Sequence, residues 1–261
     1  MASTKVHVEF RSTIALMMIL ISIAGQGCFA QGRDSTLFFR GSWSVTHNGF
    51  SFIPSFSLGK PAAIMDVAVG NKRLSFEPQF RFALEGKPWS FIFIYRYKLI
   101  NRSRFQLMLG GHLPSIAFNT QPDSSNGVVR DVMVSRRFLA GELAPTYWLS
   151  KNTSIGLYFL RGHGFDSGSI RDSHFLGLRS NFNYIKLTKR IFARFAPQFY
   201  YLKTDDTDGI YVTYSLIMAM KDFPLSISNI VNRAIQSDIP AKDFDWNVSL
   251  IYSFEKNYVR Q

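Results

Sequence analysis

Three groups of residues combine histidine, serine or aspartate in ways that could support hydrolysis or cation binding. A serine nucleophile needs a histidine base within hydrogen-bond reach, and calcium needs several oxygen ligands around one point. None of the three spacings is diagnostic of either chemistry, so we interpret these residues as polar parts of wet loops. The groups are His163, Asp166, Ser167 and His174; His112 with Ser115; and Asp205, Asp206 and Asp208.

Charged side chains form a fourth group, because they alternate with apolar residues along the chain. Apolar residues hold every second position in Leu74–Leu84 and again in Trp89–Leu99, and the pattern breaks at Glu85–Pro88. A period of two indicates a strand with one apolar and one polar face, so we expect a hairpin here. Strands this long and this aromatic are unusual in a soluble sandwich. The polar face of the hairpin carries Glu77, Arg81, Arg96 and Lys98.

The composition excludes several classes of protein. The 261 residues include 30 Lys and Arg against 18 Asp and Glu, which gives a net charge of +12, and 25 residues are Phe. The cations are dispersed along the predicted strands and not clustered, which argues against nucleic-acid binding. Beyond the N-terminal region no stretch of about 18 residues is continuously apolar, which excludes a helical membrane protein.

Residues 1–30 are typical of a secretory signal peptide. Lys5 and Arg11 precede an apolar run from Thr13 to Gly25 that is too short for a spanning helix. Cys28-Phe29-Ala30 offers small residues for cleavage before Gln31. A lipoprotein attached through Cys28 and a retained N-terminal anchor are the alternatives. Because Cys28 is the only cysteine, cleavage leaves a chain without disulfides.

The same alternation recurs along the rest of the chain and predicts twelve strands, with a range of 10–14. Links after even-numbered strands are short, whereas most links after odd-numbered strands are longer, including Leu113–Asp131. This segregation is typical of an all-β, antiparallel transmembrane β-barrel. The predicted strands are Gly49–Leu58, Ala62–Asn71, Arg73–Glu85, Pro88–Ile100, Ser103–His112, Val132–Trp148, Thr153–Gly162, Ser173–Leu187, Arg190–Leu202, Gly209–Met220, Pro224–Arg233 and Asp243–Phe254.

One segment does not fit this count. Leu37–Thr46 also alternates, and counting it separately gives thirteen strands with the termini on opposite sides. Either residues 31–48 are a lead-in, or Leu37–Thr46 is the first strand and Gly49–Asn71 is one long bent strand. We therefore assign residues 31–48 to a lead-in or first strand, residues 49–254 to the transmembrane barrel and residues 255–261 to a C-terminal tail.

Four prolines each occupy the middle of a five-residue pattern. The pattern begins with an apolar residue and ends with an aromatic residue. A proline has no N–H to donate to a ladder, so each of these prolines predicts a bulge or a locally open hydrogen bond. They are Pro54, Pro78, Pro145 and Pro197.

Aromatic residues near both ends of the predicted strands suit the two interfaces of a bilayer. The apolar face therefore meets lipid and the charged face lines an interior. The predicted girdle consists of Trp89, Tyr97, Tyr147, Tyr201, Trp246 and Tyr252.

The stretch from Gly49 to Leu99, with "GFSFIPSFSLGKPAAIMDVAVG" followed by "LSFEPQFRFALEGKPWSFIFIYRYKL", resembles a family of exported outer-membrane β-barrel proteins of Bacteroidota. Beyond Leu99 the resemblance is one of pattern and length. It implies the fold and the bacterial outer membrane as location, and it brings no catalytic residues. The last predicted strand also resembles the C-terminal signal that the barrel-insertion machinery recognises.

Function is therefore sought in the interior. The predicted lining favours a narrow passive channel for small solutes, with a weak preference for anions. The first alternative is a plugged structural barrel that binds a ligand or lipopolysaccharide, and the second is an outer-membrane lipid hydrolase. We expect no cofactor and no metal, and the oligomeric state stays open. Arg136, Arg137 and Arg171 are expected to contact lipopolysaccharide phosphates. The predicted lumen residues are Asp66, Arg73, Glu77, Arg81, Glu85, Arg96, Lys98, Arg104, Arg136, Glu142, Arg179, Arg194 and Asp245.

Overall fold

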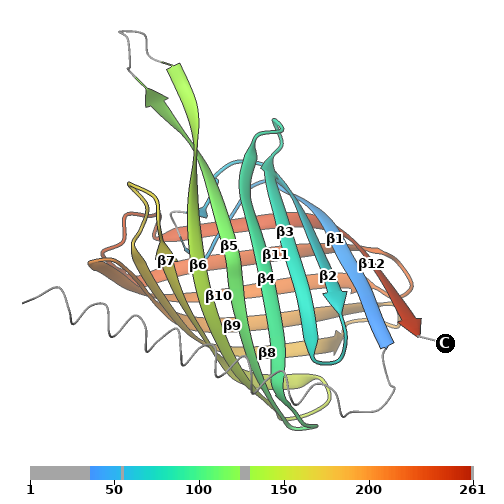
Figure 1. The fold of residues 1–261 in the computed structure, drawn as a ribbon. Helices are drawn as coiled ribbons and strands as arrows, with labels where there is room; N and C mark the ends of the chain where they lie inside the picture. The colour runs from blue at the N-terminus through green and yellow to red at the C-terminus, as the bar shows by residue number, and fades with distance from the viewer. Residues whose placement is uncertain (1–35, 54–55, 124–129, 260–261) are drawn as a thin grey trace, which may run out of the picture. The chain divides into compact units, whose positions relative to one another are not determined.

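The computed structural model describes residues 36–53, 56–123 and 130–259, which form twelve antiparallel strands closed into one barrel (Figure 1). Each strand pairs with its neighbours in sequence, and β1 pairs with β12 to close the ring. The predicted all-β antiparallel barrel is confirmed. The strands are β1 (Thr36–Thr46), β2 (Ala62–Gly70), β3 (Leu74–Ala83), β4 (Pro88–Asn101), β5 (Phe105–Asp123), β6 (Arg130–Trp148), β7 (Thr153–Gly164), β8 (Asp172–Lys186), β9 (Ile191–Thr204), β10 (Thr207–Met220), β11 (Leu225–Ser237) and β12 (Phe244–Val259).

The two rims of the barrel differ in their connections. The terminal rim holds the start of β1, the end of β12 and five turns of three or four residues. The loop rim holds the other connections, of which the longest covers residues 47–61. The predicted signal peptide over 1–30 lies outside the described residues.

The first strand agrees with the interpretation in which Leu37–Thr46 is a strand, whereas the segment after it differs from both interpretations. β1 covers Thr36–Thr46 and pairs along its length with β12 and β2, so it is a full member of the barrel and not a lead-in. The segment Gly49–Leu58 is not a strand, because it belongs to the loop 47–61. At the other end, β12 continues to Val259, so most of the predicted tail is paired with β1.

The β5–β6 hairpin is longer than expected. Residues predicted as the loop Leu113–Asp131 continue the ladder as far as Asp123 and Arg130, and the hairpin projects beyond the loop rim (Figure 1). β4 stops pairing with β5 at Ala117, so the outer part of the hairpin pairs only with itself. Its alternating polar and β-branched residues suit such a two-stranded ribbon.

Strand prolines interrupt the ladder on one side, as their missing N–H predicts. Pro78, Pro145 and Pro197 each lie in a strand that stays paired with one neighbour. On the other side the register skips two positions at each of the three prolines. Pro54 lies outside the described residues.

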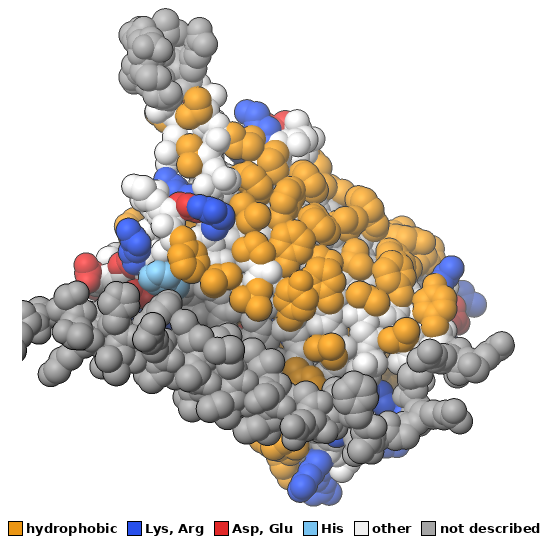
Figure 2. All heavy atoms as spheres, viewed as in Figure 1, with side chains coloured by type: hydrophobic (Ala, Val, Ile, Leu, Met, Phe, Trp, Pro, Cys, Tyr) orange, Lys and Arg blue, Asp and Glu red, His pale blue; other side chains and the backbone are white. Residues whose placement is uncertain are grey.

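The outer surface is a continuous apolar belt, in the phase that the sequence predicts (Figure 2). Aromatic residues lie at both edges of this belt. Tyr97, Tyr147 and Tyr252 face outward near the terminal rim, and Trp246 and Tyr201 do so near the loop rim. Such a belt matches the apolar core of a bilayer. No helix among the residues that the structure describes is long and apolar enough to span a membrane.

Candidate functional site

A loop folds into the lumen from the loop rim. Residues 47–61, which we call the inserted loop, are closed at their base by hydrogen bonds that Leu58 N–H and Lys60 C=O make with the backbone of Gly49, both 2.8 Å long. The ring of Phe52 packs against Phe175 and Tyr200 on the lumen wall, with centroids 6.2 and 5.9 Å away. The loop thus places the Phe52 ring inside the barrel, against the lumen wall, with 37% of the residue still accessible from the lumen.

Trp89 fastens the inserted loop and is not part of the girdle. Its indole Nε1–H donates to the carbonyl of Phe56 at 2.7 Å, and only 3% of the residue is exposed. The expectation that Trp89 faces lipid fails because the β3–β4 register shifts between Arg81 and Phe82. A bulge adds one residue and so reverses the side of the sheet to which a side chain points.

Replacing Trp89 by phenylalanine tests this anchor. The ring volume is largely kept, but the carbonyl of Phe56 loses its partner, so we expect the barrel to lose about 1 kcal/mol of unfolding free energy. Urea unfolding in detergent micelles measures the loss. Trp246→Phe on the lipid face is the matched control and leaves the unfolding free energy nearly unchanged. Equal losses in the two variants would contradict the role of Trp89.

A belt of ion pairs follows one wall of the lumen, across the neighbouring strands β3–β7, below the inserted loop. The guanidinium of Arg96 binds both Glu77 and Glu142, and its Nη2 lies 3.2 Å from Glu142 Oε2. Tyr158 Oη donates to the same Glu142 oxygen at 2.6 Å, and His112 Nε2 lies 3.5 Å from it. The Glu142 side chain is completely buried. A buried carboxylate needs such partners, because burying an unpaired charge costs several kcal/mol.

The backbone of β5, between Arg96 and Glu142, leaves room for the Glu142 side chain. Gly110 on β5 is the ladder partner of both Arg96 and Glu142. A Cβ at Gly110 would collide with the Glu142 side chain. Glycine at this position therefore lets the carboxylate lie against the wall and reach Arg96.

Three arginines of the lumen contact no carboxylate among the residues that the structure describes. Arg81 donates to the Gln79 side chain at 2.9 Å and its Cζ lies 5.2 Å from the Trp89 ring, while the Asp66 carboxylate acts on it only through space. Arg179 lies 5.0 Å from the Tyr158 ring. Arg194 lines the lumen nearer the terminal rim. The lumen is therefore richer in free cationic groups than in free carboxylates.

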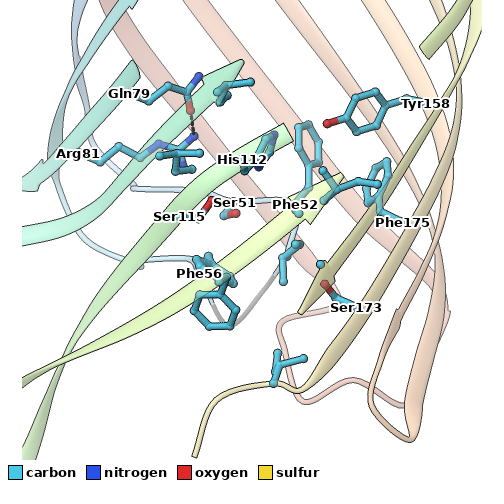
Figure 3. Close-up of a pocket in the computed structure, with 18 of the residues that line it drawn as sticks. Ser51, Phe52, Phe56, Gln79, Arg81, His112, Ser115, Tyr158, Ser173 and Phe175 are labelled. Atoms are coloured by element: carbon cyan, nitrogen blue, oxygen red, sulfur yellow. Dashed lines mark hydrogen bonds between the residues drawn. The ribbon is translucent and has the colours of Figure 1, made fainter. Parts of the chain in front are cut away.

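Cavities lie on both sides of the belt of ion pairs. The loop-side chamber is a cavity of about 340 Å³ between the inserted loop and the belt (Figure 3). Towards the terminal rim lie two cavities of about 660 and 260 Å³, which share Arg40 and Glu77. Gln79 lines both the loop-side chamber and the larger of these cavities, and Arg96 lines both the chamber and the smaller one.

One wall of the lumen is apolar, which the parity argument missed. The inward faces of β7–β10 carry a buried cluster that packs against Ile53 of the inserted loop. In the sequence, these residues are apolar or aromatic and lie in the inward phase. The prediction of a polar interior considered only the charged residues in that phase. The cluster consists of Leu160, Phe175, Tyr200, Leu202 and Tyr211.

Of the thirteen residues predicted to line the lumen, ten lie in the inward phase of the observed register and three lie in turns at the rims. Glu85 is in the β3–β4 turn at the loop rim, where it binds Lys60 Nζ at 3.0 Å, and Arg104 is in an exposed turn at the terminal rim. Both were placed inside by extending a strand past its end. Arg73 is in the turn before β3, at the mouth of the smaller terminal-side cavity. The inward set is Asp66, Glu77, Arg81, Arg96, Lys98, Arg136, Glu142, Arg179, Arg194 and Asp245.

The groups considered for hydrolysis do not assemble into a nucleophile and base. His112 and Ser115 both line the loop-side chamber, but no hydrogen bond joins them. His163 Nδ1 lies 3.3 Å from Asp172. Asp205 accepts hydrogen bonds from the backbone N–H groups of Arg171 and Asp172, so it is occupied in a loop. No group of three potential metal ligands gathers in the described part of the chain.

Asp166 and Arg137 form an ion pair at the loop rim. Arg137 Nη2 donates to Asp166 Oδ1 at 2.7 Å, and the backbone N–H of Arg137 donates to Oδ2 at 2.6 Å. These hydrogen bonds lower the pKa of Asp166 to about 2. A lowered folded-state pKa stabilises the folded loop above the unfolded value of about 3.9, and this contribution is lost as the pH falls through 2.

Because Asp166 stays ionised and paired with Arg137, we expect loop 165–171 to stay protected from proteases between pH 4 and 8. Asp166→Asn removes the charge, so we expect faster tryptic cleavage after Arg171 at neutral pH. Timed digestion followed by mass spectrometry measures the rate. Asp206→Asn, in a neighbouring loop, is the control, and the same rate in both variants would contradict the contact.

Comparisons with known proteins show the fold. No protein-family model matches the sequence, and no curated protein matches it. The solved structure described as "KdgM porin in complex with disordered oligogalacturonate" is similar, with 10% identity and a TM-score of 0.50, over 84% of this chain and 99% of that chain. The COG4313 outer membrane channel from Pseudomonas putida F1 matches with 11% identity and a TM-score of 0.47, over 87% and 97% of the two chains. The chain therefore has the porin-like fold of bacterial outer-membrane barrels. Its assignment to a Bacteroidota family stays a prediction.

Proposed function

We propose that the protein is a narrow passive channel of the bacterial outer membrane for small solutes. The observation that carries this proposal is the placement of cavities on both sides of the belt formed by Arg96, Glu77 and Glu142. A solute would enter at the loop rim beside the inserted loop, cross the belt and leave at the terminal rim. Constrictions lined by charged side chains are a common way to make a pore selective.

A preference for anions follows from the charges along this path. The carboxylates of Glu77 and Glu142 are both bound to Arg96, whereas Arg81, Arg179 and Arg194 contact no carboxylate in the described structure. A solute therefore meets cations that are free to bind it before and after the belt. Free cations in a narrow lumen raise the local concentration of anions.

A closed barrel that binds a ligand without conducting it is the alternative. It is favoured by the packing of the inserted loop against Phe175 and Tyr200, which fills part of the lumen. In that case the loop-side chamber would be a binding site open only at the loop rim.

Planar-bilayer recording of the refolded protein separates the two functions. A channel gives discrete openings, and in a salt gradient its reversal potential shifts towards that of the anion. A closed barrel gives no openings, although its band still shifts on heating in gel electrophoresis as that of a folded barrel does. Openings without a preference between anions and cations would support the channel and contradict the proposed selectivity for anions.

The partners expected from the sequence stay predictions. Arg136 faces the lumen and packs beside Gly168, so it is not placed to contact lipopolysaccharide. Arg137 and Arg171 lie at the loop rim on or near the outer surface, where phosphate groups of the outer leaflet are proposed to lie.

A further inference from the structure

The loop-side chamber has two kinds of lining. Its upper part, beneath the inserted loop, is built from aromatic rings: Phe52 packs edge-on to Phe175, and Phe56 lies 4.7 Å from Phe138. Its floor is polar and consists of side chains from the barrel wall, including Arg179, His112 and Gln198. Figure 3 shows the rings of Phe52, Phe175 and Tyr158 gathered on one side of the chamber, with Gln79 and Arg81 across from them.

The polar groups of the floor differ in how far their hydrogen bonds are already satisfied. Arg96 is held by two carboxylates, and the Tyr158 hydroxyl is donated to Glu142. Among the residues that the structure describes, the guanidinium of Arg179 makes no hydrogen bond; it lies against the Tyr158 ring, and Glu142 and Arg96 act on it electrostatically. Across the chamber, the Nε of Arg81 is buried without a hydrogen-bond partner within the described residues. Donors left without acceptors in a partly buried site favour binding of an anionic group.

We propose that the loop-side chamber binds a small amphipathic carboxylate, with its carboxylate on Arg179 and its aromatic or aliphatic body against Phe52 and Phe175. This inference rests on the proposed channel and names the class of solute that it takes. The guanidinium of Arg179 offers a planar pair of N–H donors that matches a carboxylate. The ring of Tyr158 contacts both Arg179 and Phe175. The site for the carboxylate therefore lies next to the site for the apolar part of the ligand.

The size and lining of the chamber favour this class over sugars. A volume of about 340 Å³ is within the range of small-molecule sites. A sugar acid would bring hydroxyl groups against Phe52, Phe56, Phe138 and Phe175, where they lose hydrogen bonds to water that the polar side chains elsewhere in the lining replace only in part. An aromatic carboxylate keeps its charge paired and buries only apolar surface there.

Titration calorimetry on the full refolded barrel in detergent tests the proposal with three probes. These probes are 4-phenylbutyrate, its neutral analogue 4-phenylbutanamide, and gluconate, an anion without an apolar body. We expect 4-phenylbutyrate to bind more tightly than either of the others. In the Arg179→Gln variant, the affinity for 4-phenylbutyrate falls about tenfold, which corresponds to the loss of one charge-assisted hydrogen bond. The affinity for 4-phenylbutanamide stays within about twofold of the wild-type value.

Two further variants complete the design. Phe52→Ala weakens both phenyl probes, because it removes the surface for the apolar body. Arg104→Gln, in an exposed turn at the terminal rim and outside the lumen, is the matched control and changes neither affinity. If Arg179→Gln does not fold, Arg179→Lys keeps the charge but loses the planar pair of donors, and 4-phenylbutyrate still binds less tightly to it.

The outcomes separate this site from the channel itself. Equal binding of gluconate and 4-phenylbutyrate, or an unchanged affinity in folded Arg179→Gln, overturns the site even when bilayer recording shows openings. Binding of 4-phenylbutyrate that depends on Arg179, without any openings, keeps the site and overturns the channel.

Discussion

Replacing residues 50–57 by two glycines is expected to raise single-channel conductance several-fold. The inserted loop narrows the path from the loop rim, because Phe52 and Phe56 contact the opposite wall. Gly49 and Leu58 are already joined by a hydrogen bond of 2.8 Å, so two glycines between them complete a hairpin turn without disturbing the ends of β1 and β2. Single-channel recording in planar bilayers measures the change.

The control for this shortened loop is Lys60→Gln. Lys60 lies at the base of the inserted loop and binds the exposed Glu85, so its replacement removes a surface ion pair and leaves the loop in the lumen. Conductance should stay at the wild-type value. If the shortened loop also conducts as the wild type does, the belt of ion pairs and not the inserted loop limits the current.

Arg96→Gln is expected to have the largest effect on both stability and selectivity. The substitution leaves the buried carboxylate of Glu142 without its cation and leaves Glu77 only with Arg40, whose Nη2 lies 4.0 Å from Glu77 Oε1. Breaking a buried ion pair by removing one partner typically costs 3–5 kcal/mol, so we expect an unfolding free energy lower by about 3 kcal/mol. The reversal potential in a salt gradient should move from the anion towards the cation, because Arg96 then no longer balances the negative charges of Glu77 and Glu142.

A charge-matched double variant provides the control for Arg96→Gln. Replacing Glu142 by Gln as well removes the buried carboxylate left without its cation, so the double variant should recover part of the stability and shift the reversal potential back. Urea unfolding and the salt-gradient recording measure both quantities. Loss of stability with an unchanged reversal potential would mean that ions do not pass the belt.

The strand pattern could be predicted from the sequence because it depends on local chemistry. Alternation with period two identifies strands, and long strands with an aromatic face identify the lipid side. The alternation also placed Glu142 and Arg179 in the inward phase, which the register bears out. The count of twelve was right, although it was reached with Gly49–Leu58 as a strand in place of Thr36–Thr46.

The errors arise where a residue's surroundings come from distant parts of the chain. Gly49–Leu58 alternates like a strand, but β1 already occupies the edge of β2, so the segment has no free edge and packs its rings inside the barrel. Trp89 has the parity of a lipid-facing residue, but a bulge turns it towards the inserted loop. The alternation is read along one strand alone. It therefore cannot show that this strand has one residue more than its partner at a bulge.

The sequence by itself determined that this chain is an antiparallel barrel with an apolar outside, because that property is repeated at every second residue. Only the tertiary structure decided how the inside is divided. Arg96 meets Glu142 across 46 positions of sequence, and Phe52 meets Phe175 and Tyr200 from a loop that alternation assigned to a strand. The belt and the loop-side chamber exist because closing the ring brings these side chains together, and ring closure is a property of all twelve strands and not of any one of them.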